Sequence, residues 1–136
     1  MSTSHHERIR RALDRLNQGD LEGYLALYSD AAVLHGYGLP PGKESIRAYY
    51  QAVLDAFPDA HVVLEDVLED EDRAAARYTM TATHTGAFMG HPPTGRSVTL
   101  PGLSILRFEG GQVAERWAQA DLLGLMQQIG PQAVPA

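Results

Sequence analysis

The chain has 136 residues, with 11 basic and 17 acidic side chains and a formal net charge of -6 at pH 7. This acidic balance argues against nucleic acid and anionic membrane surfaces as partners, because both require a basic patch. The chain has no cysteine, which excludes disulfides, thiol nucleophiles and zinc–thiolate sites. We expect one soluble domain over residues 1–136, with its core from about residue 5 to residue 130.

Neither a secretory signal nor a membrane span is predicted. The first residues are charged and lack the apolar core of a signal peptide. No apolar run approaches the ~18 residues that a membrane-spanning helix needs. We therefore expect a cytoplasmic protein.

Two helices are predicted at the start of the chain. Ser4, with Glu7 three residues later, fits a capping box, and apolar residues follow at helical spacing as far as Leu16. Asp20 is a suitable cap for a second helix, whose apolar positions continue to Tyr28.

A short strand is expected over residues 32–35, and a loop rich in glycine and proline over 36–42. A third helix follows from residue 43 to about residue 57, with one apolar stripe, and Pro58 ends it. Beyond it the chain indicates strands, separated by the acidic turn 70–72, the proline-containing loop 90–95 and a Gly110-Gly111 hairpin. These strands are 61–69, 73–85, 97–109 and 112–120.

One or two helical turns over 122–129, ended by Gly130 and Pro131, complete the chain. Helices grouped on one face of an antiparallel sheet make an α+β domain. Three helices against a curved sheet leave a concave face, which is where small-molecule pockets usually form.

Strand alternation predicts which side chains face that pocket. The even positions of strand 73–85 are apolar, include Tyr78 and Met80, and end at His84. The even positions of strand 97–109 also face inward, which leaves Leu103 and Ile105 on the outer face. An apolar spot there indicates a subunit interface, so we expect a homodimer through the outer face of the sheet.

The last strand is harder to orient. Val113 and Trp117 favour an inward odd face, which would also carry Glu115 and Asp121. A β-bulge would reverse part of this assignment.

Sequence motifs for dinucleotides, phosphate loops, serine nucleophile elbows and His-Glu-x-x-His zinc sites all fail. A metal site made of His35, His84 and Asp121 has no support from spacing, so no metal is predicted. His84 also fits a hydrogen-bonded core histidine, and Asp121 fits the N-cap of the final helix. Together, however, His84 and Asp121 beside the Trp117 ring would supply acid/base groups next to an apolar platform.

A further set of stretches occurs in a specific order. It consists of Tyr28-Ser29-Asp30 leading to His35, Ala56-Phe57-Pro58-Asp59, Thr83-His84-Thr85-Gly86, residues 90–96, Glu115-Arg116-Trp117 through Asp121, and Gly124-Leu125 to Gly130. With these stretches the chain, from about Leu13 to Gly130, resembles the SnoaL-like polyketide cyclases of the nuclear-transport-factor-2-like superfamily. One departure is Ala82, where members often carry glycine before the Thr-His pair.

The resemblance implies a cone-shaped α+β barrel around a deep apolar cavity. It also implies a cofactor-independent enzyme that closes a polyketide ring by intramolecular aldol condensation. In that reaction Asp121 would be the acid/base residue, and His84 and His35 would assist at the enolate or the new alkoxide. On this hypothesis Asp121→Asn abolishes turnover and leaves folding intact.

The expected ligand is a small apolar carbonyl or aromatic compound. The residues expected to bind it are Trp117, Tyr78, Met80, Phe88, Met89, Tyr50 and Glu115. Two alternatives stay open: another cofactor-free enzyme of this fold, ketosteroid-isomerase-like or epoxide-hydrolase-like, and a non-catalytic binding module. A hydrolase would need an Asp-Arg-Asp relay, and Arg77 is expected to point outward.

Overall fold

The computed structural model describes residues 4–130, so Pro131 lies outside the described part. Four α-helices and five strands follow one another within these residues. In chain order they are α1 (His5–Asn17), α2 (Leu21–Leu25), β1 (Tyr28–His35), α3 (Lys43–Ala56), β2 (His61–Asp70), β3 (Arg73–Thr83), β4 (Ser97–Glu109), β5 (Gln112–Ala120) and α4 (Leu122–Ile129).

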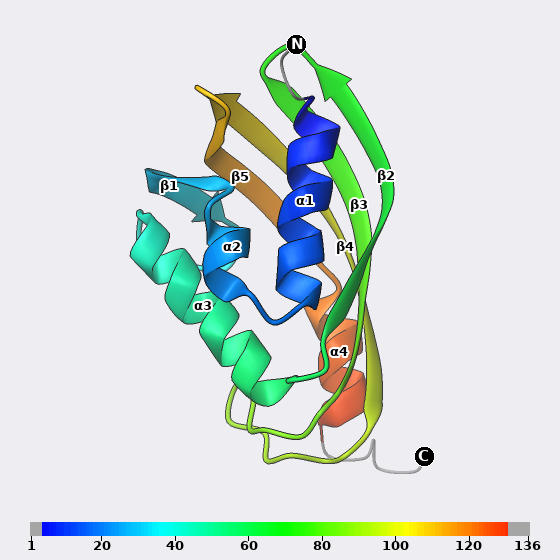
Figure 1. Cartoon of the computed structure of the whole chain (residues 1–136). Helices are drawn as coiled ribbons and strands as arrows, with labels where there is room; N and C mark the ends of the chain where they lie inside the picture. The colour runs from blue at the N-terminus through cyan, green and yellow to red at the C-terminus, as the bar shows by residue number, and fades with distance from the viewer. Residues whose placement is uncertain (1–3, 131–136) are drawn as a thin grey trace.

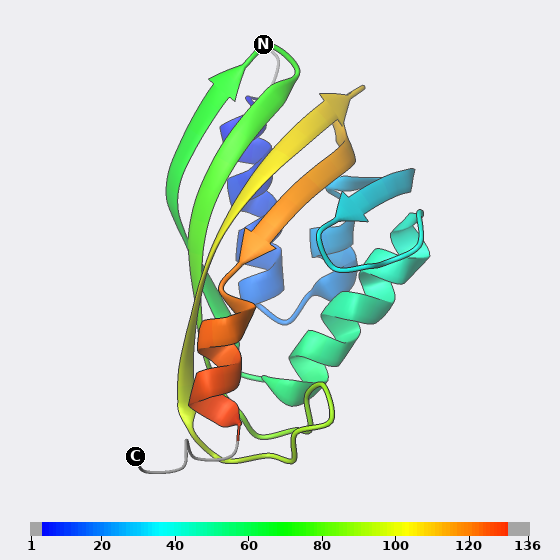
Figure 2. The same ribbon diagram turned by 180° about the vertical axis from the view of Figure 1, so that it is seen from behind.

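The strands form one curved sheet in the order β1-β5-β4-β3-β2. Strands β2 to β5 are antiparallel neighbours, as expected, whereas β1 joins the edge parallel to β5. Helices α1, α2 and α3 cover one face of this sheet (Figure 1). Seen from behind, the outer face is open and α4 follows the end of β5 (Figure 2). The α+β class is therefore confirmed.

The predicted caps start the first two helices. The Ser4 side chain accepts a hydrogen bond from the Glu7 backbone N–H, and the Asp20 carboxylate accepts one from the Gly23 N–H. The second helix is shorter than predicted and Tyr28 already belongs to β1. The reason is that the Leu27 carbonyl accepts from the Val113 N–H at 2.7 Å, so the sheet takes over the backbone bonds there.

The alternation predicted for β3 and β4 is confirmed. The buried hydrophobic residues on the inward face of these strands are Ala74, Ala76, Met80, Ala82, Val98, Leu106 and Phe108. On the opposite face, Leu103 and Ile105 are 53% and 45% exposed. One face of the β3–β4 pair therefore builds the core and the other carries an exposed apolar spot.

A β-bulge changes the orientation of β5. Arg107 pairs with Glu115 while Phe108 pairs with Val113, so Ala114 is the extra residue. The inward odd face holds at Val113, but beyond the bulge the even residues face inward and Arg116 is buried. The prediction that Trp117 and Glu115 face inward is wrong for this reason.

The turn after β1 depends on a glycine that approaches β5 closely. Gly36 has φ of 110°, and a Cβ there would overlap the backbone carbonyl oxygen of Ala118. We expect Gly36→Ala to lower the free energy of unfolding by about 3 kcal/mol, because a strained backbone and a clash add together.

The matched control is Gly38→Ala. Gly38 also has a positive φ, 70°, but nothing lies within 4 Å of the added Cβ. Its cost should stay near the roughly 1–2 kcal/mol of a left-handed residue. Urea unfolding of both variants measures the difference, and equal costs would contradict the close approach to Ala118.

Candidate functional site

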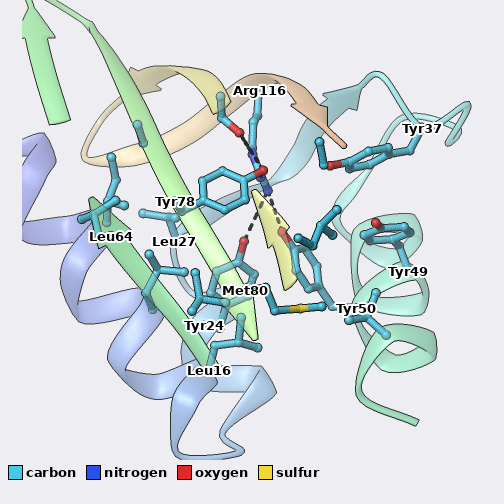
Figure 3. A pocket seen from close by; sticks show the side chains of 18 of the residues that line it. Leu16, Tyr24, Leu27, Tyr37, Tyr49, Tyr50, Leu64, Tyr78, Met80 and Arg116 are labelled. Carbon is cyan, nitrogen blue, oxygen red and sulfur yellow. Dashed lines mark hydrogen bonds between the residues drawn. The ribbon is translucent and has the colours of Figure 1, made fainter. Parts of the chain in front are cut away.

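A cavity lies between the three covering helices and the inner face of the sheet (Figure 3). Its wall is mostly aliphatic and aromatic. About 80 Å³ inside it is open to the centres of water molecules, several times the roughly 10–15 Å³ that one water needs by that measure. The cavity is therefore the candidate functional site.

Arg116 brings a positive charge to the wall of this cavity. Its side chain comes from β5, beyond the bulge, and the residue is only 5% exposed. Its Nη1 donates to the hydroxyls of Tyr50 at 2.6 Å and Tyr28 at 3.0 Å. Its Nη2 donates to the Tyr78 hydroxyl at 3.0 Å, and Nε donates to the Ser104 Oγ at 3.0 Å.

All of these acceptors are hydroxyl oxygens of serine or tyrosine, and none belongs to a carboxylate. No aspartate or glutamate is among the residues that line the cavity, and none of the ion pairs within residues 4–130 involves Arg116. A buried cation without an opposite charge is costly. A guanidinium in this position is suited to an anionic oxygen, with which its hydrogen bonds would be strongest.

The direction of these hydrogen bonds leaves hydroxyl hydrogens for other acceptors. Since the guanidinium can only donate, each phenol oxygen beside it accepts, and its own O–H is left to donate. Tyr28 and Tyr24 share one such bond, at 2.7 Å. The hydroxyl of Tyr50 can therefore donate to an oxygen atom that enters the cavity next to Arg116.

The phenols around the cavity differ in acidity. Burial raises the pKa of Tyr24, Tyr28, Tyr37 and Tyr49 above the ordinary value. Burial also acts to raise the pKa of Tyr78, but the charge of Arg116 and hydrogen bonds from neighbouring groups outweigh it, so the pKa of Tyr78 is lowered. Tyr78 is the exception in this group.

These shifts make stability sensitive to alkaline pH. Below the ordinary tyrosine pKa of about 10, both states of the chain hold the protons of the four phenols with raised pKa. Above it the unfolded chain releases them and the native chain keeps them, so the free energy of unfolding falls as pH rises. We expect a fall of up to about 1.4 kcal/mol per pH unit for each phenol.

Urea unfolding from about pH 8 to about pH 11 would measure this fall. Tyr49→Phe removes one of the four contributions and should make the fall shallower. Tyr78 contributes with the opposite sign because its pKa is lowered. A free energy of unfolding that stays constant over this range would contradict the burial of these hydroxyls.

The structure places four of the predicted substrate-binding residues in the cavity wall. They are Tyr50, Tyr78, Met80 and Phe88. Met89, the neighbour of Phe88, lies outside the wall and is 66% exposed. Contact of the four with a substrate stays a prediction.

Trp117 and Glu115 lie on the outer face of the sheet instead, because of the bulge in β5. His35, which pairs with Trp117 from β1, lies beside them. The His35 Nε2 is 2.7 Å from the Glu115 Oε2, and the His35 and Trp117 rings stack with centroids 5.3 Å apart. The hydrogen bond from His35, helped by Arg107, lowers the pKa of Glu115 despite partial desolvation. The homodimer expected through this face stays a prediction.

Asp121 lies where β5 gives way to α4 and is the N-cap of that helix. Its Oδ1 accepts from the Gly124 N–H at 2.9 Å, and the residue is exposed. Ala120 and Leu122 on either side line the cavity, but Asp121 does not. The inward orientation predicted for Asp121 is therefore wrong, and its acid/base role stays a prediction without the burial that motivated it.

His84 follows directly after β3 and is fully buried, as its place on the inner face of the predicted strand 73–85 implies. Its Nδ1 accepts from the Thr94 backbone N–H at 3.3 Å, which fastens the loop between β3 and β4. Its Nε2 has no hydrogen-bond partner within the described part of the chain. The ring packs on Phe57, with centroids 5.5 Å apart, and Phe57 rather than His84 lines the cavity.

Residues 4–130 contain neither a cluster suited to a metal ion nor a membrane-spanning helix. No three histidine, aspartate or glutamate side chains gather closely enough to hold a metal ion. No helix in this part is long and apolar enough to cross a membrane.

Tyr50 and Tyr78 were expected in the cavity, but the charged group between them, Arg116, was not predicted from the sequence. Arg116 stands in β5 among small residues, Ala114 and Ala118, which leave room for one long side chain. That spacing, read together with Tyr49-Tyr50 on the apolar stripe of α3, could have indicated a polar cluster. The bulge concealed it, because it reverses which residues face inward.

Comparisons with known proteins agree on family and fold. The model of the family SnoaL-like polyketide cyclase matches residues 7–129. AclR from Streptomyces galilaeus, described as a candidate hydroxylase, is 31% identical, with a TM-score of 0.85 over 97% of this chain and 87% of that one. IdmH from Streptomyces antibioticus, a candidate polyketide cyclase, is 29% identical, with a TM-score of 0.78 over 93% of this chain and 98% of that one.

TsrD from Streptomyces laurentii is similar as well, at 25% identity, with a TM-score of 0.85 over 95% of this chain and 98% of that one. The search among curated proteins found no match. These solved structures carry different reaction names on one fold, so the fold alone does not decide the reaction.

Proposed function

Since the chain belongs to the SnoaL-like polyketide cyclase family, we propose that it is a cofactor-independent, cyclase-type enzyme acting on a small, largely apolar carbonyl compound. The proposed reaction is an intramolecular aldol condensation. One observation carries the proposal: the Arg116 guanidinium is buried in an apolar cavity whose lining has no carboxylate. Such a site favours an oxygen on which negative charge develops.

The cavity supplies what an enolate needs. Removing a proton from the carbon beside a carbonyl places negative charge on the carbonyl oxygen. The Tyr50 hydroxyl, which accepts from Arg116 Nη1 at 2.6 Å, would donate to that oxygen, and the guanidinium charge behind it would stabilise it. The apolar wall would hold the rest of the compound by burial.

Two alternatives are weaker on this geometry. An epoxide-hydrolase-like relay would place an arginine between aspartates, but Arg77 is on the outer face, bound to Asp66 at 2.6 Å, and the neighbours of Arg116 are hydroxyls. A ketosteroid-isomerase-like site would aim its tyrosine at a carboxyl pair, and no carboxyl group lines this cavity. A non-catalytic binding module would have the same cavity geometry and would differ only in not converting its ligand to a product.

The test uses 1-phenylhexane-1,5-dione, which closes to 3-phenylcyclohex-2-enone with loss of one water. We expect the protein to accelerate this closure, followed by absorbance of the conjugated product. Arg116→Gln should reduce the rate by about 10² to 10³, the loss typical of one oxyanion-stabilising donor.

The matched control is Arg77→Gln, the same substitution on the outer face of β3, and it should keep the wild-type rate. Thermal unfolding of both variants shows that they fold. Binding of the diketone without acceleration would assign the protein to the binding modules. Acceleration that is equal in wild type and Arg116→Gln would contradict the role of the guanidinium.

A further inference from the structure

We propose that Tyr78 is the catalytic acid/base residue of the cavity, and that Arg116 and Ser104 position its hydroxyl oxygen for proton exchange with the substrate. This inference rests on the proposed function and names the group that moves the proton. It is carried by the placement of the Tyr78 ring and by the donors around its oxygen (Figure 3).

The ring of Tyr78 lies across β4 because the opposite residue is a glycine. Tyr78 pairs with Gly102, and a Cβ on Gly102 would lie 2.6 Å from two ring carbons and 2.7 Å from the hydroxyl oxygen of Tyr78. Such separations are far below a van der Waals contact. The missing side chain at Gly102 is therefore the space that lets the Tyr78 hydroxyl reach Arg116.

Several donors point at the Tyr78 oxygen. Arg116 Nη2 donates to it at 3.0 Å. Ser104 Oγ accepts from Arg116 Nε at 3.0 Å, so its own hydrogen is directed to Tyr78 at 3.4 Å. Tyr37 interacts with the same oxygen. Donors that converge on one oxygen stabilise its ionised form.

The surrounding elements add no competing negative charge. The groups that face Tyr78 are the Arg116 guanidinium of β5 and the phenols of Tyr37, from the loop after β1, and of Tyr49 and Tyr50 on α3. No carboxylate lines the cavity. A phenolate at Tyr78 would thus give the buried guanidinium the opposite charge that it otherwise lacks.

The proton balance closes within the site. The Tyr78 phenolate takes a proton from the carbon beside a carbonyl, so a C–H bond breaks, an O–H bond forms, and the electron pair becomes the enolate. The enolate carbon then attacks the second carbonyl, which forms the C–C bond and an alkoxide. The alkoxide takes the proton back from the Tyr78 hydroxyl, which completes the aldol addition and restores the phenolate. For the loss of water, the phenolate takes a second proton from the same carbon, the C–O bond breaks, and the leaving hydroxide takes that proton from the Tyr78 hydroxyl. Water is released, and the phenolate is restored without any co-reactant.

The first test needs no substrate. Tyrosinate absorbance is followed against pH in wild type, Tyr78→Phe and the control Tyr49→Phe. We expect one tyrosine to titrate below the ordinary pKa of about 10 in wild type and in Tyr49→Phe, and none to do so in Tyr78→Phe. An early titration that persists in Tyr78→Phe would overturn the proposal.

The second test follows deuterium exchange at the carbons beside the carbonyl of 2-tetralone in D₂O, by proton NMR. We expect exchange by the wild type to rise with pH and level off below about pH 10, because the phenolate is the base. Tyr78→Phe, which keeps the ring, should lose about 10² to 10⁴ in rate and the pH-dependent rise. Gly102→Ala should lose part of the exchange rate and part of its pH-dependent rise, since the added methyl group displaces Tyr78.

A third variant, Asp121→Asn, separates this proposal from the role expected of Asp121. Its side-chain oxygen can still cap α4. Exchange that is lost in Asp121→Asn and kept in Tyr78→Phe would overturn the assignment of Tyr78 and leave the proposed function standing. Absence of both exchange and diketone closure in the wild type, with the early titration present, would instead overturn the proposed function.

Discussion

The buried guanidinium of Arg116 is the constraint on which the rest of the structure depends. It lies in an apolar interior, so its N–H groups must all find partners. Those partners come from every layer of the fold: Tyr24 from α2, Tyr28 from β1, Tyr50 from α3, Tyr78 from β3 and Ser104 from β4. Hydrogen bonds to a charged group are worth about 1.5–3 kcal/mol each. The same contacts that hold helices to sheet therefore also arrange the cavity's polar groups.

Much of the fold could be predicted from the sequence because the signals are local. The Ser4 and Asp20 caps depend on a side chain and a backbone N–H only three residues apart. The inward faces of β3 and β4 follow from strict alternation in an uninterrupted antiparallel pair. The parallel pairing of β1 with β5 was not predicted, since it joins segments about eighty residues apart that carry no pairing signal of their own.

The candidate site was predicted only in part, for a similar reason. Tyr78 and Met80 were expected in the wall because β3 keeps its alternation. The apolar residues Val113 and Trp117 both favoured an inward odd face of β5. Only Val113 faces inward, because Ala114, which lies between the two in the chain, is left out of the pairing with β4. Arg116 was not predicted, because a hydropathy pattern gives no signal for a buried cation whose partners lie on five other elements.

The bulge at Ala114 has a consequence for how this protein can vary. Which residues of β5 face inward depends on whether Ala114 pairs with β4 or is left out as a bulge, and not on the identity of the side chains beyond it. If the same residues paired with β4 in regular alternation, without the bulge, the two faces beyond Val113 would be exchanged, which would move the stacked Trp117 inward and the guanidinium out to solvent. A relative with the same residues in β5 but no bulge at this point would thus present an aromatic lining where this chain presents a charge, and so would accept a different class of ligand.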